Sequence, residues 1–108
     1  MSGTSTPSLT PRSLQETVLI ARRMAATASG LPPSTFEVLA AEVVQWADGS
    51  IGCPQPGQLY TQALVQGYRV QLRGTDGNVL SFHAGLRGAV IQCPEGRAQA
   101  PASGGIDR

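Results

Sequence analysis

The stretch DGSIGCPQPG, residues 48–57, restricts the fold more than any other part of the chain. It holds three glycines, two prolines and a cysteine within ten residues, and no helix or strand interior tolerates that density of chain-breaking residues. Trp46 precedes it and Tyr60 follows it, so the stretch is not a bland polar linker. We therefore expect an ordered loop that interrupts the regular structure of the domain.

The length and the charge of the chain indicate a single small domain that does not bind nucleic acid. The chain has 108 residues, of which 41% are hydrophobic, which suits one small domain with a single modest core. Eight arginines and seven acidic residues nearly cancel, and the arginines are scattered. Because non-specific nucleic-acid affinity depends on clustered basic residues that neutralise phosphates, we expect no nucleic-acid partner.

Targeting signals are missing from the sequence as given. It contains no apolar run of about 18 residues, the length that a membrane span needs, so no membrane association is expected. The N-terminal stretch MSGTSTPSLTPRS lacks the basic and apolar regions of a secretory signal. We therefore expect a cytoplasmic protein, with export left open, because two cysteines suit free thiols in the cytosol and a disulfide after export.

Composition and capping signals divide the chain into three parts. Residues 1–12 and 94–108 are poor in large apolar groups, so we expect two disordered tails around one domain at 13–93. A helix is predicted over 13–29, since the SLQE sequence at its start forms a capping box between Ser13 and Glu16. Gly30 is suited to end the helix, and the two prolines that follow prevent its continuation.

The rest of the domain reads as antiparallel strands. A strand is predicted over 35–46, with a bulge or a more buried stretch within 39–43 where the alternation fails. Alternating residues predict strands at 68–72 and 79–83, joined by a hairpin turn at Asp76-Gly77, with Ser81 and His83 facing outward. A last short strand is expected at 89–93, whereas 58–67 suits either a strand or a turn of helix. This order predicts an α+β fold, one N-terminal helix on a three- to four-stranded antiparallel sheet.

A longer stretch around the loop resembles a known kind of domain. Residues 46–72, WADGSIGCPQPGQLYTQALVQGYRVQL, are similar to a small uncharacterised bacterial domain marked by W-x-D-G-S-[LI]-G-C-P-x-P-G followed by Y-T-Q-x-L-V-x-G-Y-[RK]-[IV]. The resemblance extends to the Phe82-His83 pair and to Cys93, and it implies no activity and no cofactor. The chain departs from this pattern at Ala47 and Gln66, where proline is usual.

Two non-enzymatic interpretations of the loop stay open. In the first it is architectural: its glycines supply positive φ, its prolines stiffen it, and Asp48 caps a turn. In the second it is a rigid recognition loop for a protein partner, with Ile51 as an anchor at its tip; protease-inhibitor loops share this logic. The residues of this predicted binding loop are Asp48, Gly49, Ser50, Ile51, Gly52, Cys53, Pro54, Pro56 and Gly57, supported by Trp46, Tyr60 and Tyr68. No oligomeric state is predicted.

The two cysteines and the single histidine raise further hypotheses. A thiol enzyme would use Cys53 as nucleophile and His83 as base, but one histidine in a small domain is weak support, so we favour a non-enzyme with no catalytic residue. A metal site of Cys53, Cys93 and His83 would lack the paired ligand spacing usual for zinc, so no metal or cofactor is expected. Because a proline follows each cysteine where regular structure ends, we predict that Cys53 and Cys93 lie close enough to form a disulfide.

Overall fold

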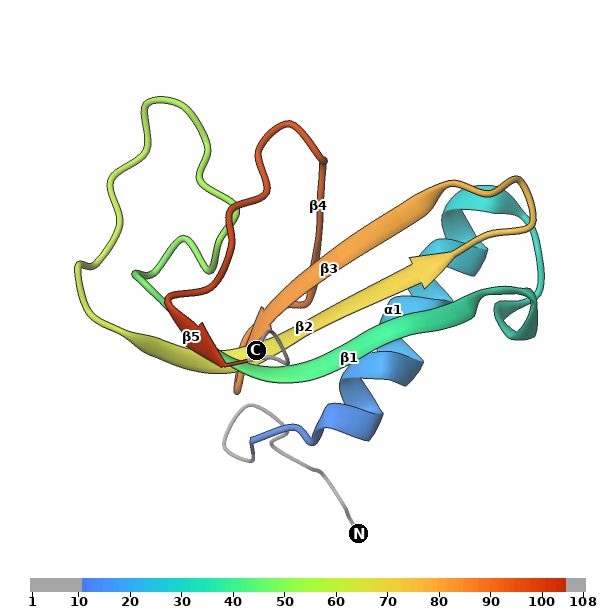
Figure 1. The fold of residues 1–108 in the computed structure, drawn as a ribbon, viewed down its shortest axis with the longest axis horizontal. Coiled ribbons are helices and arrows are strands. Elements are labelled where there is room, and N and C mark those ends of the chain that lie inside the picture. Colours follow the sequence, from blue (N-terminus) through green and yellow to red (C-terminus); the bar gives the residue numbers. More distant parts are fainter. Residues whose placement is uncertain (1–10, 105–108) are drawn as a thin grey trace, which may run out of the picture.

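One helix and five strands follow each other along the chain in the computed structural model, which describes residues 11–104. The elements are α1 (Leu14–Ser29), a 3₁₀ turn (Pro33–Thr35), β1 (Glu37–Trp46), β2 (Val65–Arg73), β3 (Val79–Gly85), β4 (Ile91–Cys93) and β5 (Ser103–Gly104). The strands form one sheet in the order β4-β3-β2-β1-β5, and every neighbouring pair is antiparallel. Helix α1 lies across one face of this sheet (Figure 1), so the predicted α+β fold is confirmed.

The ends of α1 follow the capping signals. The Ser13 hydroxyl accepts a hydrogen bond from the Glu16 N–H at 3.0 Å, and the Ser13 N–H donates to the Glu16 carboxylate at 2.7 Å. This reciprocal pair satisfies two backbone donors that a helix start leaves free. At the other end Gly30 has φ 80°, and its N–H donates to the Ala26 carbonyl, so a glycine is needed to end the helix there.

The main core lies between α1 and the sheet. Small residues of the helix, Ala21 and Ala25, pack against Val70, Leu72 and Phe82 from the strands. The pairing of β1 with β2 shifts register between Val38 and Ala40, which agrees with the bulge predicted in that strand. The 3₁₀ turn takes up residues 33–35, so β1 begins two residues later than expected. Residues 58–64 form neither strand nor helix.

The C-terminal segment, residues 94–104, differs from the predicted disordered tail. Its Gln99 N–H donates to the Gly52 carbonyl and its Ala102 N–H to the Gln45 carbonyl, both at 2.8 Å, before β5 pairs with β1. Backbone hydrogen bonds hold this segment, and such bonds leave no trace in composition. Only residues 105–108 of the predicted tail lie outside the described residues.

The folded domain also begins one residue earlier than predicted, because Arg12 is hydrogen-bonded to it. Arg12, predicted to belong to a disordered tail, donates its N–H to the Leu86 carbonyl at 2.9 Å and its guanidinium to the Gly85 and Gly88 carbonyls. The Arg12 carbonyl in turn accepts from the Tyr68 hydroxyl at 2.8 Å. Residues 1–10 lie outside the described residues.

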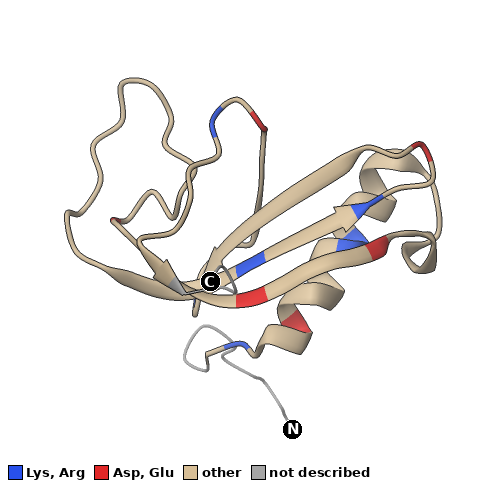
Figure 2. Ribbon diagram, viewed as in Figure 1, with Lys and Arg blue, Asp and Glu red and all other residues tan. Residues whose placement is uncertain are grey.

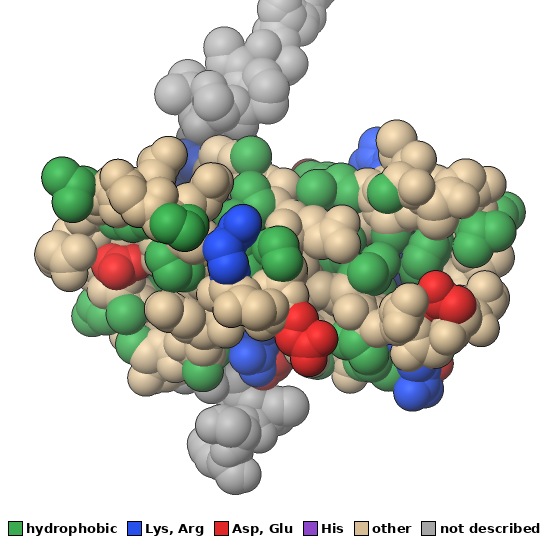
Figure 3. Space-filling view, turned by 90° about the horizontal axis from the view of Figure 1, so that it is seen from above, with side chains coloured by type: hydrophobic (Ala, Val, Ile, Leu, Met, Phe, Trp, Pro, Cys, Tyr) green, Lys and Arg blue, Asp and Glu red, His purple; other side chains and the backbone are tan. Residues whose placement is uncertain are grey.

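Charged and apolar side chains are distributed unevenly. Strands β1 and β2 carry acidic and basic residues side by side (Figure 2), where Glu42 pairs with Arg69 at 2.8 Å and Glu37 with Arg73 at 3.0 Å. Figure 3 shows one side of the molecule, on which hydrophobic side chains outnumber charged ones. Of the helices in residues 11–104, none has the length and apolar character needed to cross a membrane.

Candidate functional site

The sheet face opposite α1, here called the loop face, is covered at one end only. There the loop between β1 and β2, residues 47–64, and the C-terminal segment lie over the strands (Figure 1). Trp46 and His83 lie beneath them with stacked rings, whose centroids are 4.5 Å apart. The Trp46 indole N–H donates to the Ala84 carbonyl at 3.0 Å. These rings form a second, smaller core that fixes where the loop can rest.

His83 lies on the predicted outward face of β3, yet it is not exposed to solvent there. Its side chain does point to the face opposite α1, as the alternation predicts, but the covering segments leave it only 1% exposed. Its Nδ1 donates to the Ile51 carbonyl at 2.8 Å, and its Nε2 lies 3.3 Å from the Ser81 hydroxyl, from which it accepts when the ring is neutral. Burial lowers the pKa of His83, the Ile51 carbonyl opposes this, and the positive charge of Arg69 lowers it further. The ring is therefore neutral at pH 7.

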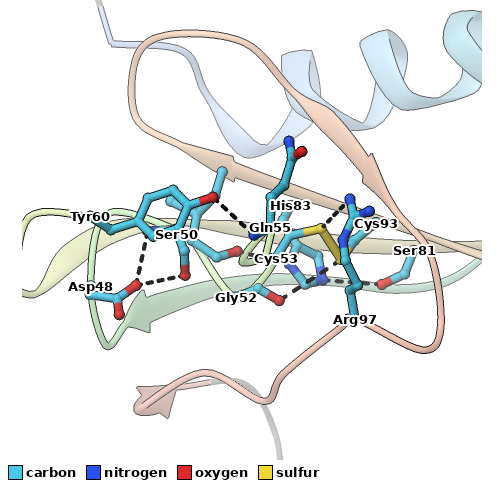
Figure 4. Close-up of a disulfide and its surroundings, with 11 residues drawn as sticks. Asp48, Ser50, Gly52, Cys53, Gln55, Tyr60, Ser81, His83, Cys93 and Arg97 are labelled. Carbon is cyan, nitrogen blue, oxygen red and sulfur yellow. Dashed lines mark hydrogen bonds between the residues drawn. A yellow bond between two sulfur atoms is a disulfide. The ribbon is translucent and has the colours of Figure 1, made fainter. Parts of the chain in front are cut away.

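The first half of the loop lies beside His83, as Figure 4 shows. The Asp48 carboxylate accepts from the Ser50 hydroxyl at 2.6 Å and from the Ser50 N–H at 2.9 Å, and these bonds lower the pKa of Asp48. Ile51 and Gly52 then take positive φ of 46° and 75°. A Cβ on Gly52 would lie 2.4 Å from the Trp46 ring, so only glycine fits against the indole at this turn.

The two cysteines join this turn to the edge of the sheet. Cys53 and Cys93 form a disulfide with a Cα–Cα distance of 5.8 Å, and both residues are buried. The Arg97 guanidinium donates to the Cys53 sulfur at 3.6 Å, so the C-terminal segment also covers the bridge. Residues 47–64, tied down in this way, are called the clasped loop below.

The two chemical sites that were considered as alternatives, a thiol enzyme and a metal site, are not assembled in this arrangement. The Cys53 sulfur is bonded to Cys93, and the His83 nitrogens face Ile51 and Ser81. Cys53 and His83 therefore do not form a nucleophile–base pair here, because such a pair needs a free thiolate. Within residues 11–104 no three or more His, Cys, Asp or Glu side chains gather in a group that could hold a metal ion.

The outer half of the clasped loop is the part that reaches solvent. The Tyr60 hydroxyl accepts from the Gln55 N–H at 2.9 Å, and the Gly49 N–H donates to the Thr61 carbonyl at 2.9 Å. These bonds close a compact turn on which Leu59 is 97% exposed. Leu64, later in the same loop, is 60% exposed.

Two sequence predictions about the loop need correction. Ile51 is not an exposed anchor, because it is half-buried and its carbonyl faces His83. Tyr68 does not support the loop: it alternates with Val70 and Leu72 on the face that packs against α1, and its hydroxyl bonds Arg12. The exposure of Leu59 could not be predicted from the sequence, since it lies in the segment 58–67, for which the pattern of apolar residues suited either a strand or a turn of helix.

Comparison with known proteins places the chain in a family. Residues 18–93 match a domain of unknown function, DUF8738. The chain belongs to this family. The match agrees with the resemblance at the level of an uncharacterised small domain, and it runs from the second turn of α1 to the end of β4. Among curated proteins and solved structures, none matches the chain.

Proposed function

We propose that the protein is a small binding module that presents the clasped loop to a protein partner, with Leu59 as the anchor. One observation carries the proposal: a large apolar side chain stands 97% exposed on a loop that is otherwise tied to the sheet. A flexible loop would lose conformational entropy when it binds, whereas a loop held beforehand loses little. The outer half of this loop is therefore suited to insert Leu59 into an apolar pocket.

The ties that hold the loop act on both sides of Leu59. The disulfide fixes Cys53 before it, and the bond between the Gly49 N–H and the Thr61 carbonyl fixes the chain after it. Residues 49–64 contain no charged side chain, so an apolar pocket would not have to desolvate a charge beside the anchor. A protease is one class of partner that would accept such a loop, as the inhibitor-like interpretation supposes.

The test compares matched variants in affinity capture from an extract of the cells that make the protein. A partner that binds the oxidised wild type should be lost on Leu59→Asp and retained on Val79→Asp. Val79 is the control because it is also an exposed apolar residue, 53% accessible, in the hairpin strand β3. Reduction of the disulfide should weaken capture. Partners that bind Leu59→Asp as well as they bind the wild type would contradict the proposal.

A further inference from the structure

A second apolar surface lies on the other side of the molecule, beside α1. The helix packs mainly on β1, β2 and β3, which leaves a groove between α1 and the terminal strand β4. One hollow of this α1–β4 groove has a volume of about 520 Å³. It is lined by Ile20, Arg23, Met24, Thr27, Ala28 and Gln92.

The groove continues into a neighbouring hollow toward the β2–β3 hairpin. This second hollow, about 250 Å³, shares Ala28 and Gln92 with the first, and Leu31, Phe36 and Leu80 add apolar walls. Figure 3 looks onto the molecule from above and shows a hollow with hydrophobic side chains at the right of the view. Two adjacent hollows along one groove suit two apolar side chains of a single bound segment.

The outer edge of β4, beside the groove, can accept another strand. Strand β4 ends the sheet on this side, and within residues 11–104 no other segment pairs with its outer edge. Its sequence Ile91–Cys93 contains no proline or charged residue, the side chains by which proteins commonly block an exposed edge. An extended peptide can add to such an edge through main-chain hydrogen bonds while its alternate side chains enter nearby pockets.

Charge distinguishes the two ends of the groove. Arg23 is the single charged residue that lines the larger hollow, and it forms no ion pair within the described part of the chain. Asp76 lines the smaller hollow, where its carboxylate accepts from the Asn78 N–H and side-chain amide. An acidic side chain would therefore be attracted at the Arg23 end and repelled at the Asp76 end.

We propose that the α1–β4 groove binds an extended peptide segment of a partner protein, which adds to the outer edge of β4. The segment places two apolar side chains, two residues apart, in the two hollows, because alternate side chains of a strand point to the same face. It carries an Asp or Glu that pairs with Arg23. This site is separate from the clasped loop and does not depend on the function proposed for Leu59.

The test selects random linear peptides displayed on phage against the folded, oxidised protein. We expect a consensus of two apolar residues at positions i and i+2 with an acidic residue beside them. Selection on Arg23→Glu should replace the acidic residue by a basic one. Arg87→Glu is the matched control, an exposed arginine in the turn after β3 that does not line either hollow, and it should leave the consensus unchanged.

A second measurement locates the selected peptide. Ala28→Arg fills both hollows from an exposed position of α1 and should weaken binding by about tenfold or more, whereas Leu19→Arg, an exposed helix position outside the hollows, and Leu59→Asp should not. Amide shifts should cluster at 91–93 and along α1. No consensus, binding that is indifferent to Ala28→Arg, or a β4-mediated dimer of the chain in sedimentation would each overturn the proposal.

Discussion

Removal of the disulfide should cost the protein a large share of its stability. The two cysteines are 40 residues apart, and for a loop of that length the chain-entropy model gives about 13 cal/mol/K, or about 4 kcal/mol at room temperature. Small domains have a total free energy of unfolding of roughly 5–15 kcal/mol. We therefore expect Cys53→Ala/Cys93→Ala to unfold at much lower denaturant concentration than the oxidised wild type.

The assay is urea unfolding followed by the fluorescence of Trp46, the single tryptophan of the chain, which lies beneath the clasped loop. Reductant should remove the same free energy from the wild type and should leave the double variant unchanged. The m-value should be higher for the reduced wild type and for the double variant than for the oxidised wild type, because an unfolded chain without the bridge exposes more surface. The wild type can be reduced in place, so the comparison holds even if the variant does not fold. A loss below about 1 kcal/mol on reduction would refute the entropic reasoning.

Further expectations concern the small core under the loop. Gly52→Ala should lower the free energy of unfolding in urea more than Gly57→Ala does. Both glycines have positive φ, which costs about 1–2 kcal/mol for a residue with a Cβ, but only at Gly52 would the Cβ meet Trp46, which adds about 1–3 kcal/mol of overpacking. Equal losses in the two variants would contradict the close approach of Gly52 to Trp46. Because the pKa of His83 is lower in the folded state than its ordinary 6.5, the unfolded chain binds that proton more readily. The free energy of unfolding should thus be highest above pH 6.5 and should fall as the pH drops below 6.5. His83→Asn, which keeps an N–H toward Ile51, should make the free energy of unfolding less dependent on pH in this range.

The helix and the order of the strands could be predicted because their signals are local. The Ser13 and Glu16 capping box and Gly30 fixed both ends of α1, and alternation fixed the faces of β2 and β3. Alternation also placed His83 opposite the helix. It could not show that the loop and the C-terminal segment cover this face. These segments are held by hydrogen bonds from their backbone to other backbone groups and to the His83 ring, between residues far apart in the chain.

The candidate site was predicted only in part for the same reason. The glycine and proline content of 48–57 indicated an ordered loop, yet which residue of that loop reaches solvent depends on where the loop folds back. Ile51 is turned inward by the His83 bond, and the Tyr60–Gln55 bond turns Leu59 outward. Neither bond can be recognised from a sequence pattern, because each joins a backbone group to a His or Tyr side chain, and these side chains form many other kinds of contact in proteins.

The C-terminal segment also bears on where the domain should be cut for expression. The family match ends at residue 93, which is the second half-cystine itself. A protein truncated there would keep every family residue and could still oxidise. It would lose the donors to Gly52 and Gln45, the β5 pairing and the Arg97 contact over the sulfur. Its disulfide would then be open to reductants that the longer chain excludes, so a boundary beyond residue 104 is the one that preserves the redox stability of the fold.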